Sequence, residues 1–216
     1  MSSVRQKVAL QFIVSNLALV ANFLLIIVLA RLLSPKDIGI FSMSAVLMAI
    51  AHVFRDFGVT AFIKREKELT PASLSSALGV LLITSWSVAA LMFVSAPYWA
   101  DFFHEAGVIP VVQVLALGFV FIPFGAIPMA IISREMAVEK WARISAVTTV
   151  VYVSASVGLA LAGFGPMTMA WANLINIITT GAMARWALGR PLPWLPTFGQ
   201  SKSSVHFRPG NLHTAQ

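Results

Sequence analysis

The sequence predicts an all-α, polytopic membrane protein, a bundle of six transmembrane helices. The first observation is composition: of 216 residues, 58% are hydrophobic and only 11% are charged, and the mean hydropathy is +0.86. A soluble globule needs more polar surface than this. The second observation is a series of apolar runs that are long enough to cross a bilayer. The third is that the cations gather in alternate connections between these runs.

Six apolar runs give the predicted spans, each at or near the roughly 20 residues that cross the hydrocarbon of a bilayer. The first run exceeds the 7 to 15 apolar residues, roughly, of a signal-peptide core, so we expect it to remain as a helix. The spans cover residues 8–30, 38–59, 74–99, 108–133, 144–162 and 167–188. Together they form one predicted transmembrane lobe over residues 1–190, and the polar residues 191–216 are predicted to be a disordered cytoplasmic tail.

The positions of the cations predict the orientation of the bundle. Two cations, Arg31 and Lys36, lie in the connections on one side, and twelve lie on the side of the amino terminus. Basic connections stay in the cytoplasm, so both termini are predicted to be cytoplasmic. The same distribution explains the pI of about 10.4 without a nucleic-acid partner, because the cations are scattered among short connections. The twelve are Arg5, Lys7, Lys64, Arg65, Lys67, Arg134, Lys140, Arg143, Arg185, Arg190, Lys202 and Arg208.

Three titratable residues near the end of the second span form the first candidate site. His52, Arg55 and Asp56 have helical spacings of three and four residues and therefore share one face. A charge inside a bilayer is costly and usually faces a bundle interior or a hydrated cavity. One hypothesis is that Arg55, supported by His52, attracts an anionic head group, while Asp56 orients Arg55 or takes part in proton or ion coupling. The alternative is that Arg55 extends to nearby lipid head groups and fixes the depth of the helix.

Polar residues on the last two spans form the second candidate site. Asn173, Asn176 and Thr180 recur at helical spacing on the sixth span, and a similar stripe on the fifth contains Ser145, Thr148 or Thr149, Tyr152 and Ser156. These side chains could line a polar cavity and bind a ligand there through hydroxyl and amide hydrogen bonds. The alternative is that they are polar contacts between helices, worth roughly 0.6 kcal/mol each in a membrane.

The sequence predicts no enzymatic activity, no cofactor and no metal site. It lacks GxSxG, Walker A and HExxH motifs, and its four histidines are widely separated. It also contains no cysteine, which removes disulfides and thiolate metal sites. Without a Walker A motif, the sequence gives no sign that this chain hydrolyses ATP itself.

Three segments resemble the amino-terminal half of bacterial polysaccharide flippases. These are ARLLSPKDIGIFSMSAV between the first two spans, FRDFGVTAFI at the end of the second, and Arg134-Glu135-Met136 after the fourth. Such flippases are the O-antigen and exopolysaccharide translocases of the multidrug/oligosaccharidyl-lipid/polysaccharide exporter superfamily. The resemblance implies a multi-pass protein of the bacterial inner membrane. It also implies transport of an undecaprenyl-diphosphate-linked oligosaccharide from the cytoplasmic to the periplasmic leaflet, with this glycolipid and membrane lipids as partners.

The chain departs from that family in length. Family members have twelve or more spans in two six-helix lobes that face each other, whereas this sequence continues after its sixth span into the polar residues 200–216. The departure leaves two alternatives to a working flippase lobe. One is a truncated membrane fragment that does not transport, and the other is a half-transporter that needs a second six-helix lobe or a second copy of itself.

The predicted orientation can be tested with reporter fusions. Alkaline phosphatase fused at Asp101 or at Gly165 should be active, because the enzyme folds only in the periplasm. Fusions at Lys67 and Glu139 should be inactive with that enzyme and fluorescent with a cytoplasmic reporter. The reverse pattern at all four positions would refute the orientation.

Overall fold

The computed structural model describes residues 2–55 and 71–189, and within these ranges all regular secondary structure is α-helical. Residues 56–59 of the predicted second span and the predicted tail, 191–216, lie outside the described residues. The all-α prediction is confirmed. The six helices are α1 (Ser2–Leu32), α2 (Pro35–Arg55), α4 (Pro71–Phe103), α5 (Val108–Arg134), α6 (Val138–Leu161) and α7 (Met167–Leu188).

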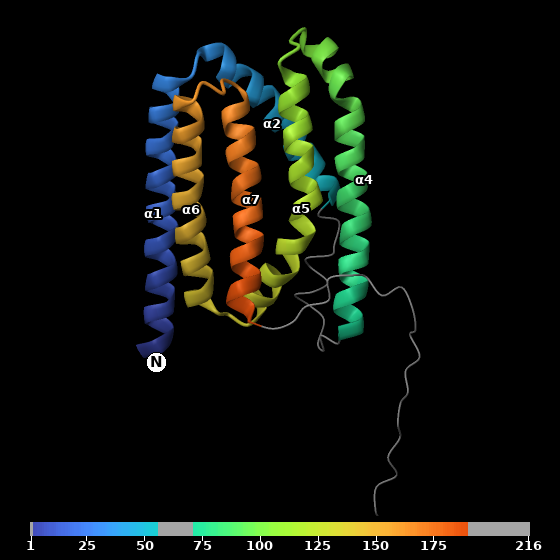
Figure 1. Cartoon of the computed structure of the whole chain (residues 1–216). Coiled ribbons are helices and arrows are strands. Elements are labelled where there is room, and N and C mark those ends of the chain that lie inside the picture. Colours follow the sequence, from blue (N-terminus) through green and yellow to red (C-terminus); the bar gives the residue numbers. More distant parts are fainter. Residues whose placement is uncertain (1, 56–70, 190–216) are drawn as a thin grey trace, which may run out of the picture.

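Five of the helices stand side by side in the order α1, α6, α7, α5, α4, and α2 crosses behind this layer (Figure 1). Helix α1 packs on α6, while α7 packs between α6 and α5. Helix α2 contacts α5, α4 and α7, and Figure 1 shows its described end about halfway down the bundle. One face of the layer is therefore crossed by α2 over part of its height, and the opposite face is not.

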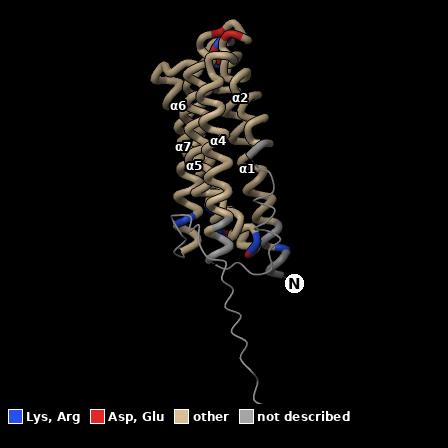
Figure 2. Tube along the Cα trace, turned by 90° about the vertical axis from the view of Figure 1, so that its right-hand side faces the viewer, with Lys and Arg blue, Asp and Glu red and all other residues tan. Residues whose placement is uncertain are grey.

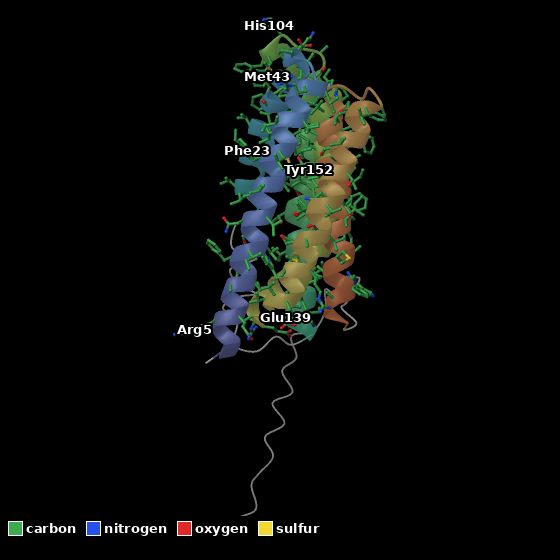
Figure 3. The ribbon with its side chains drawn as sticks, turned by 90° about the vertical axis from the view of Figure 1, so that its left-hand side faces the viewer. Arg5, Phe23, Met43, His104, Glu139 and Tyr152 are labelled. Carbon is green, nitrogen blue, oxygen red and sulfur yellow. The ribbon has the colours of Figure 1, made fainter. Side chains whose placement is uncertain are left out.

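Length and composition make the described helices a membrane bundle. Five of them, α1, α2, α4, α5 and α6, are long and apolar enough to cross a bilayer. Helix α7 has 22 residues, also enough for a crossing, but its two asparagines lower its hydropathy. Large apolar side chains cover the outside, such as Phe12 and Phe23 on α1, which are 69% and 64% exposed. Figure 3 shows Phe23 at the outer edge of the bundle. Such a surface needs lipid around it.

A capping box turns the chain sharply from α1 into α2. The Ser34 backbone N–H donates to the Asp37 carboxylate at 3.0 Å, and the Asp37 backbone N–H donates to the Ser34 hydroxyl oxygen at 3.1 Å. These bonds satisfy groups that a helix start leaves unpaired. One residue before Asp37, Lys36 forms a 3.2 Å salt bridge with Glu105 in the turn between α4 and α5. The two interactions connect the start of α2 to the layer behind which it crosses.

Helix α5 is the most buried of the candidate spans, because 61% of the residues in its most apolar stretch are buried inside the bundle. Its helix continues through Pro123 and Pro128, and its lower part bends toward α7 (Figure 1). The helix is kinked there because each proline removes a backbone hydrogen bond and crowds the preceding turn. The fully buried Phe119 lies just before this bend.

The backbones of helices α5 and α7 approach each other closely at two glycines. A Cβ atom added to Gly125 would lie 2.9 Å from the Cα atom of Gly181, whereas one added to Gly181 would lie 3.5 Å from the Cα atom of Gly125. The first distance requires a backbone to move, and the second is an ordinary van der Waals contact. Small residues commonly permit such close helix packing in membranes.

This asymmetry predicts different effects for two matched substitutions. Gly125→Ala should lower the free energy of unfolding by about 1 to 3 kcal/mol relative to Gly181→Ala, through overpacking. Both substitutions add the same methyl group and bring the same gain in helix propensity, so the difference isolates the steric term. Thermal unfolding of the purified variants in one detergent, followed by circular dichroism, measures it. Equal stability of the two variants would contradict the packing.

Candidate functional site

The structure places His52 deep in the bundle. Its ring lies against that of Phe119, with centroids 4.8 Å apart and planes inclined by 41°. Phe119 is fully buried and is 11 residues from the start of α5 and 15 from its end. Since a helix rises about 1.5 Å per residue, His52 lies roughly 22 Å along α5 from the end at Arg134.

Arg55 is the last described residue of α2. Its backbone lies about one helical turn beyond His52, which is still far from the end of α5. Figure 1 agrees, because the described part of α2 ends about halfway down the bundle. The side chain of Arg55 and all of Asp56 lie outside what the structure describes. The predicted grouping of His52, Arg55 and Asp56 therefore stays a prediction. The structure gives the depth of His52 in the bundle.

On α7, the predicted asparagines share a face that points toward the side where α2 crosses. Asn173, Asn176 and Thr180 follow Met169 by four, seven and eleven residues, so the four residues lie on one side of the helix. Met169 packs against the same cluster as Ile38 of α2 and Tyr152 of α6. That cluster consists of Leu25, Leu29, Leu33 and Ala160.

Tyr152 on α6 lies at the same height as Asn176 on α7. The two helices are antiparallel and joined by residues 162–166, with Tyr152 ten residues before this turn and Asn176 ten residues after it. Figure 3 shows Tyr152 near the middle of the height of the bundle, beside α1. Thr148 and Thr149 precede Tyr152 by four and three residues, so both lie on its side of α6. Thr148 is buried and donates a hydrogen bond to the Ser145 carbonyl at 3.2 Å.

His52 lies at this height too. Helices α5 and α7 run in the same direction, and the contact between Gly125 and Gly181 fixes their register. Phe119 is six residues before Gly125, and Ile175 is six residues before Gly181, so Phe119 and Ile175 lie at the same height. Ile175 is next to Asn176, and His52 packs against Phe119, so His52 lies at the height of Asn176. We define the mid-bundle polar face as the half-buried residues His52, Tyr152, Asn173, Asn176 and Thr180.

The mid-bundle polar face provides hydrogen-bonding groups at the depth where water is scarcest. Thr180 donates to the backbone carbonyl of Asn176 at 2.7 Å, which leaves the Asn176 amide group for other partners. Amide, hydroxyl and imidazole groups can donate to and accept from sugar hydroxyls. No cluster of three or more His, Asp or Glu that could hold a metal exists among the described residues. The arrangement suits polar binding rather than metal chemistry.

Two other grooves of the described bundle are lined mostly by apolar side chains. A groove of about 310 Å³ between α2, α4 and α5 has Ser95 and Trp99 as its lining residues with polar side-chain atoms. Another, of about 320 Å³, lies between α5 and α7 on the face away from α2 and ends at Arg185. Neither groove includes a member of the mid-bundle polar face, so these hollows do not coincide with the predicted site.

Charged residues collect at the two ends of the bundle. Figure 2 shows most of the described basic residues at the end where the amino terminus lies, and acidic residues mainly at the other end. Arg5 and Glu139 mark the first end, and His104 marks the second (Figure 3). The apolar length between them is what a bilayer requires, so the chain is a membrane protein.

Comparisons with known proteins agree with the architecture. The polysaccharide biosynthesis protein family matches residues 28–209. The chain is also 26% identical over 142 residues to the lipopolysaccharide biosynthesis protein WzxC of Escherichia coli (strain K12). That match covers 66% of this chain and 28% of WzxC, so the chain spans less than a third of its relative. No solved structure matches the chain significantly. Because the family match covers most of the sequence, the chain belongs to the polysaccharide biosynthesis protein family.

Proposed function

We propose that this chain is one lobe of a flippase that moves an undecaprenyl-diphosphate-linked oligosaccharide across the bacterial inner membrane. Membership of the polysaccharide biosynthesis protein family supports a role in building or exporting a glycan. The observation that carries the proposal is the mid-bundle polar face, where three helices bring polar side chains to one height inside an apolar bundle. A protein that only anchors itself in lipid gains little from polar groups at that depth.

In this proposal different residues bind the sugar and the diphosphate parts of the substrate. Asn173 and Asn176 exchange hydrogen bonds with sugar hydroxyls, and the Tyr152 ring offers an apolar surface with a polar tip. Arg55, assisted by His52, attracts the diphosphate, because a guanidinium binds phosphate oxygens through two parallel hydrogen bonds. Asp56 orients Arg55 or couples transport to a proton or another ion. The chain itself performs no covalent chemistry and uses no cofactor.

The lobe needs a second surface to enclose its substrate. A polar face that met only lipid would be costly, since hydrocarbon offers no hydrogen bonds. We propose that another six-helix lobe, or a second copy of this chain, covers it. The basic end of the bundle faces the cytoplasm in this proposal, and so do both termini. The greater length of WzxC is consistent with a lobe that works as part of a larger assembly.

A substitution on α7 distinguishes substrate binding from simple helix packing. Asn176→Leu keeps the size of the side chain and removes its hydrogen bonds. If Asn176 contacts the glycan, this variant in the chromosomal copy of the native host should lower surface polysaccharide at least about fivefold, with unchanged amounts of protein in the membrane. Loss of a hydrogen bond to a substrate of this kind costs about 1 to 3 kcal/mol.

The control is Ile178→Leu, two residues away, because Ile178 lies on the opposite side of α7 and is 44% exposed. It should export normally. Arg55→Lys tests the diphosphate role, since lysine keeps the charge without the planar fork, and it should reduce export as well. If Asn176→Leu lowers export only in proportion to the amount of folded protein, Asn176 serves packing and the proposed role is wrong.

A further inference from the structure

A notch between α6 and α7 at the basic end of the bundle combines charged and apolar lining residues. It has a volume of about 230 Å³, and its lining is Lys140, Arg143, Ile144, Met183, Trp186 and Ala187. The two cations come from the first turns of α6, and the apolar residues come mostly from the last turns of α7. The notch is thus positively charged on the side of α6 and apolar on the side of α7.

The position of the cations makes an anion favourable there. Helix α6 begins after Ala137 without a side-chain capping hydrogen bond, and the start of a helix carries a partial positive charge. Lys140 and Arg143 add two full charges within six residues of that start. Cations at this end of a helix are unfavourable on their own. A bound anion would relieve the repulsion and would meet three sources of positive potential.

The nearby carboxylates leave this potential largely in place. Glu139 is exposed and borders a separate hollow between α1 and α6, which it shares with Arg143. Glu135 is also exposed, at the end of α5. Across residues 2–55 and 71–189, neither Lys140 nor Arg143 has a carboxylate oxygen within 4.0 Å. Their charges are therefore available to a ligand.

The rest of the notch suits a lipid. Trp186 is 79% exposed beside it, as expected of a tryptophan at the boundary between hydrocarbon and head groups. Ile144 and Met183 lie deeper, with Ile144 2% exposed. A phosphate held by the two cations would place its glycerol and acyl chains along these apolar side chains. Basic pockets between transmembrane helices commonly bind anionic head groups in this way.

We propose that the notch between α6 and α7 binds an anionic glycerophospholipid, with its phosphodiester on Lys140 and Arg143 and its acyl chains beside Met183 and Trp186. The site lies at the end of the bundle, away from the mid-bundle polar face. It depends on the chain being in a membrane and does not depend on which glycan is transported. The ligand is a lipid of the surrounding bilayer, distinct from the diphosphate carrier of the proposed function.

Native mass spectrometry of the full-length chain in detergent can test this site. The probes are palmitoyl-oleoyl phosphatidylglycerol and the phosphatidylcholine with the same acyl chains. Wild-type protein should bind the phosphatidylglycerol at least tenfold more tightly. Lys140→Gln combined with Arg143→Gln should weaken that binding about 30-fold, the change expected from two surface cations, and should leave phosphatidylcholine binding unaltered.

The matched control is Arg5→Gln combined with Arg31→Gln, which removes the same charge from exposed positions on α1. It should change phosphatidylglycerol binding less than twofold. The wild type and the two double variants should have the same unfolding temperature in lipid-free detergent. If the double variant of Lys140 and Arg143 fails to fold, the single substitutions Lys140→Gln and Arg143→Gln replace it, and each should weaken phosphatidylglycerol binding about fivefold. Equal losses in both double variants, or equal affinity of the wild type for the two phospholipids, would overturn the proposal. Farnesyl diphosphate serves as a probe for the diphosphate carrier lipid. If the Lys140→Gln and Arg143→Gln double variant lost farnesyl diphosphate binding but kept phosphatidylglycerol binding, the notch would belong to the carrier lipid and the proposal would be overturned.

Discussion

The close approach of α5 and α7 at Gly125 and Gly181 sets the geometry on which the candidate site depends. It fixes the register of two helices that run in the same direction, and through Phe119 it brings His52 of α2 to the level of Asn176 of α7. A slip of one turn would move Asn176 about 5 Å away from that level. In a bilayer this packing has no hydrophobic driving force, so the fit of small residues carries much of the stability.

The helices could be predicted well from the sequence because each membrane span appears as a long apolar run. A span must be helical to satisfy its own backbone, so a long apolar run has few alternatives. Asn173 and Asn176 could be assigned to one face of α7 from their spacing alone. Their alignment with His52 could not be predicted, because it depends on which helices are neighbours and on a glycine contact between residues 56 positions apart.

The sequence was less informative about the depth of α2. Counted along the chain, Arg55 stands nine residues before the basic segment that begins at Lys64, which suggested a position near the membrane surface. In the structure α2 crosses behind the layer and His52 packs at mid-height on α5, while the role of Arg55 stays a prediction. The tilt of a helix follows from its packing, and no local sequence pattern records it. The capping box at Ser34 and Asp37 and the salt bridge from Lys36 to Glu105 hold the upper end of this crossing.

The central claim is that the mid-bundle polar face meets water or substrate inside the membrane. Because the chain has no cysteine, single cysteines report accessibility without further changes. In native membranes, a small charged thiol reagent should modify Asn173→Cys and Asn176→Cys, since a reactive thiolate needs a hydrated site. It should spare Leu174→Cys, which faces α5, and Ile178→Cys, which faces away. Modification of Ile178→Cys with protection of both asparagine positions would contradict the account.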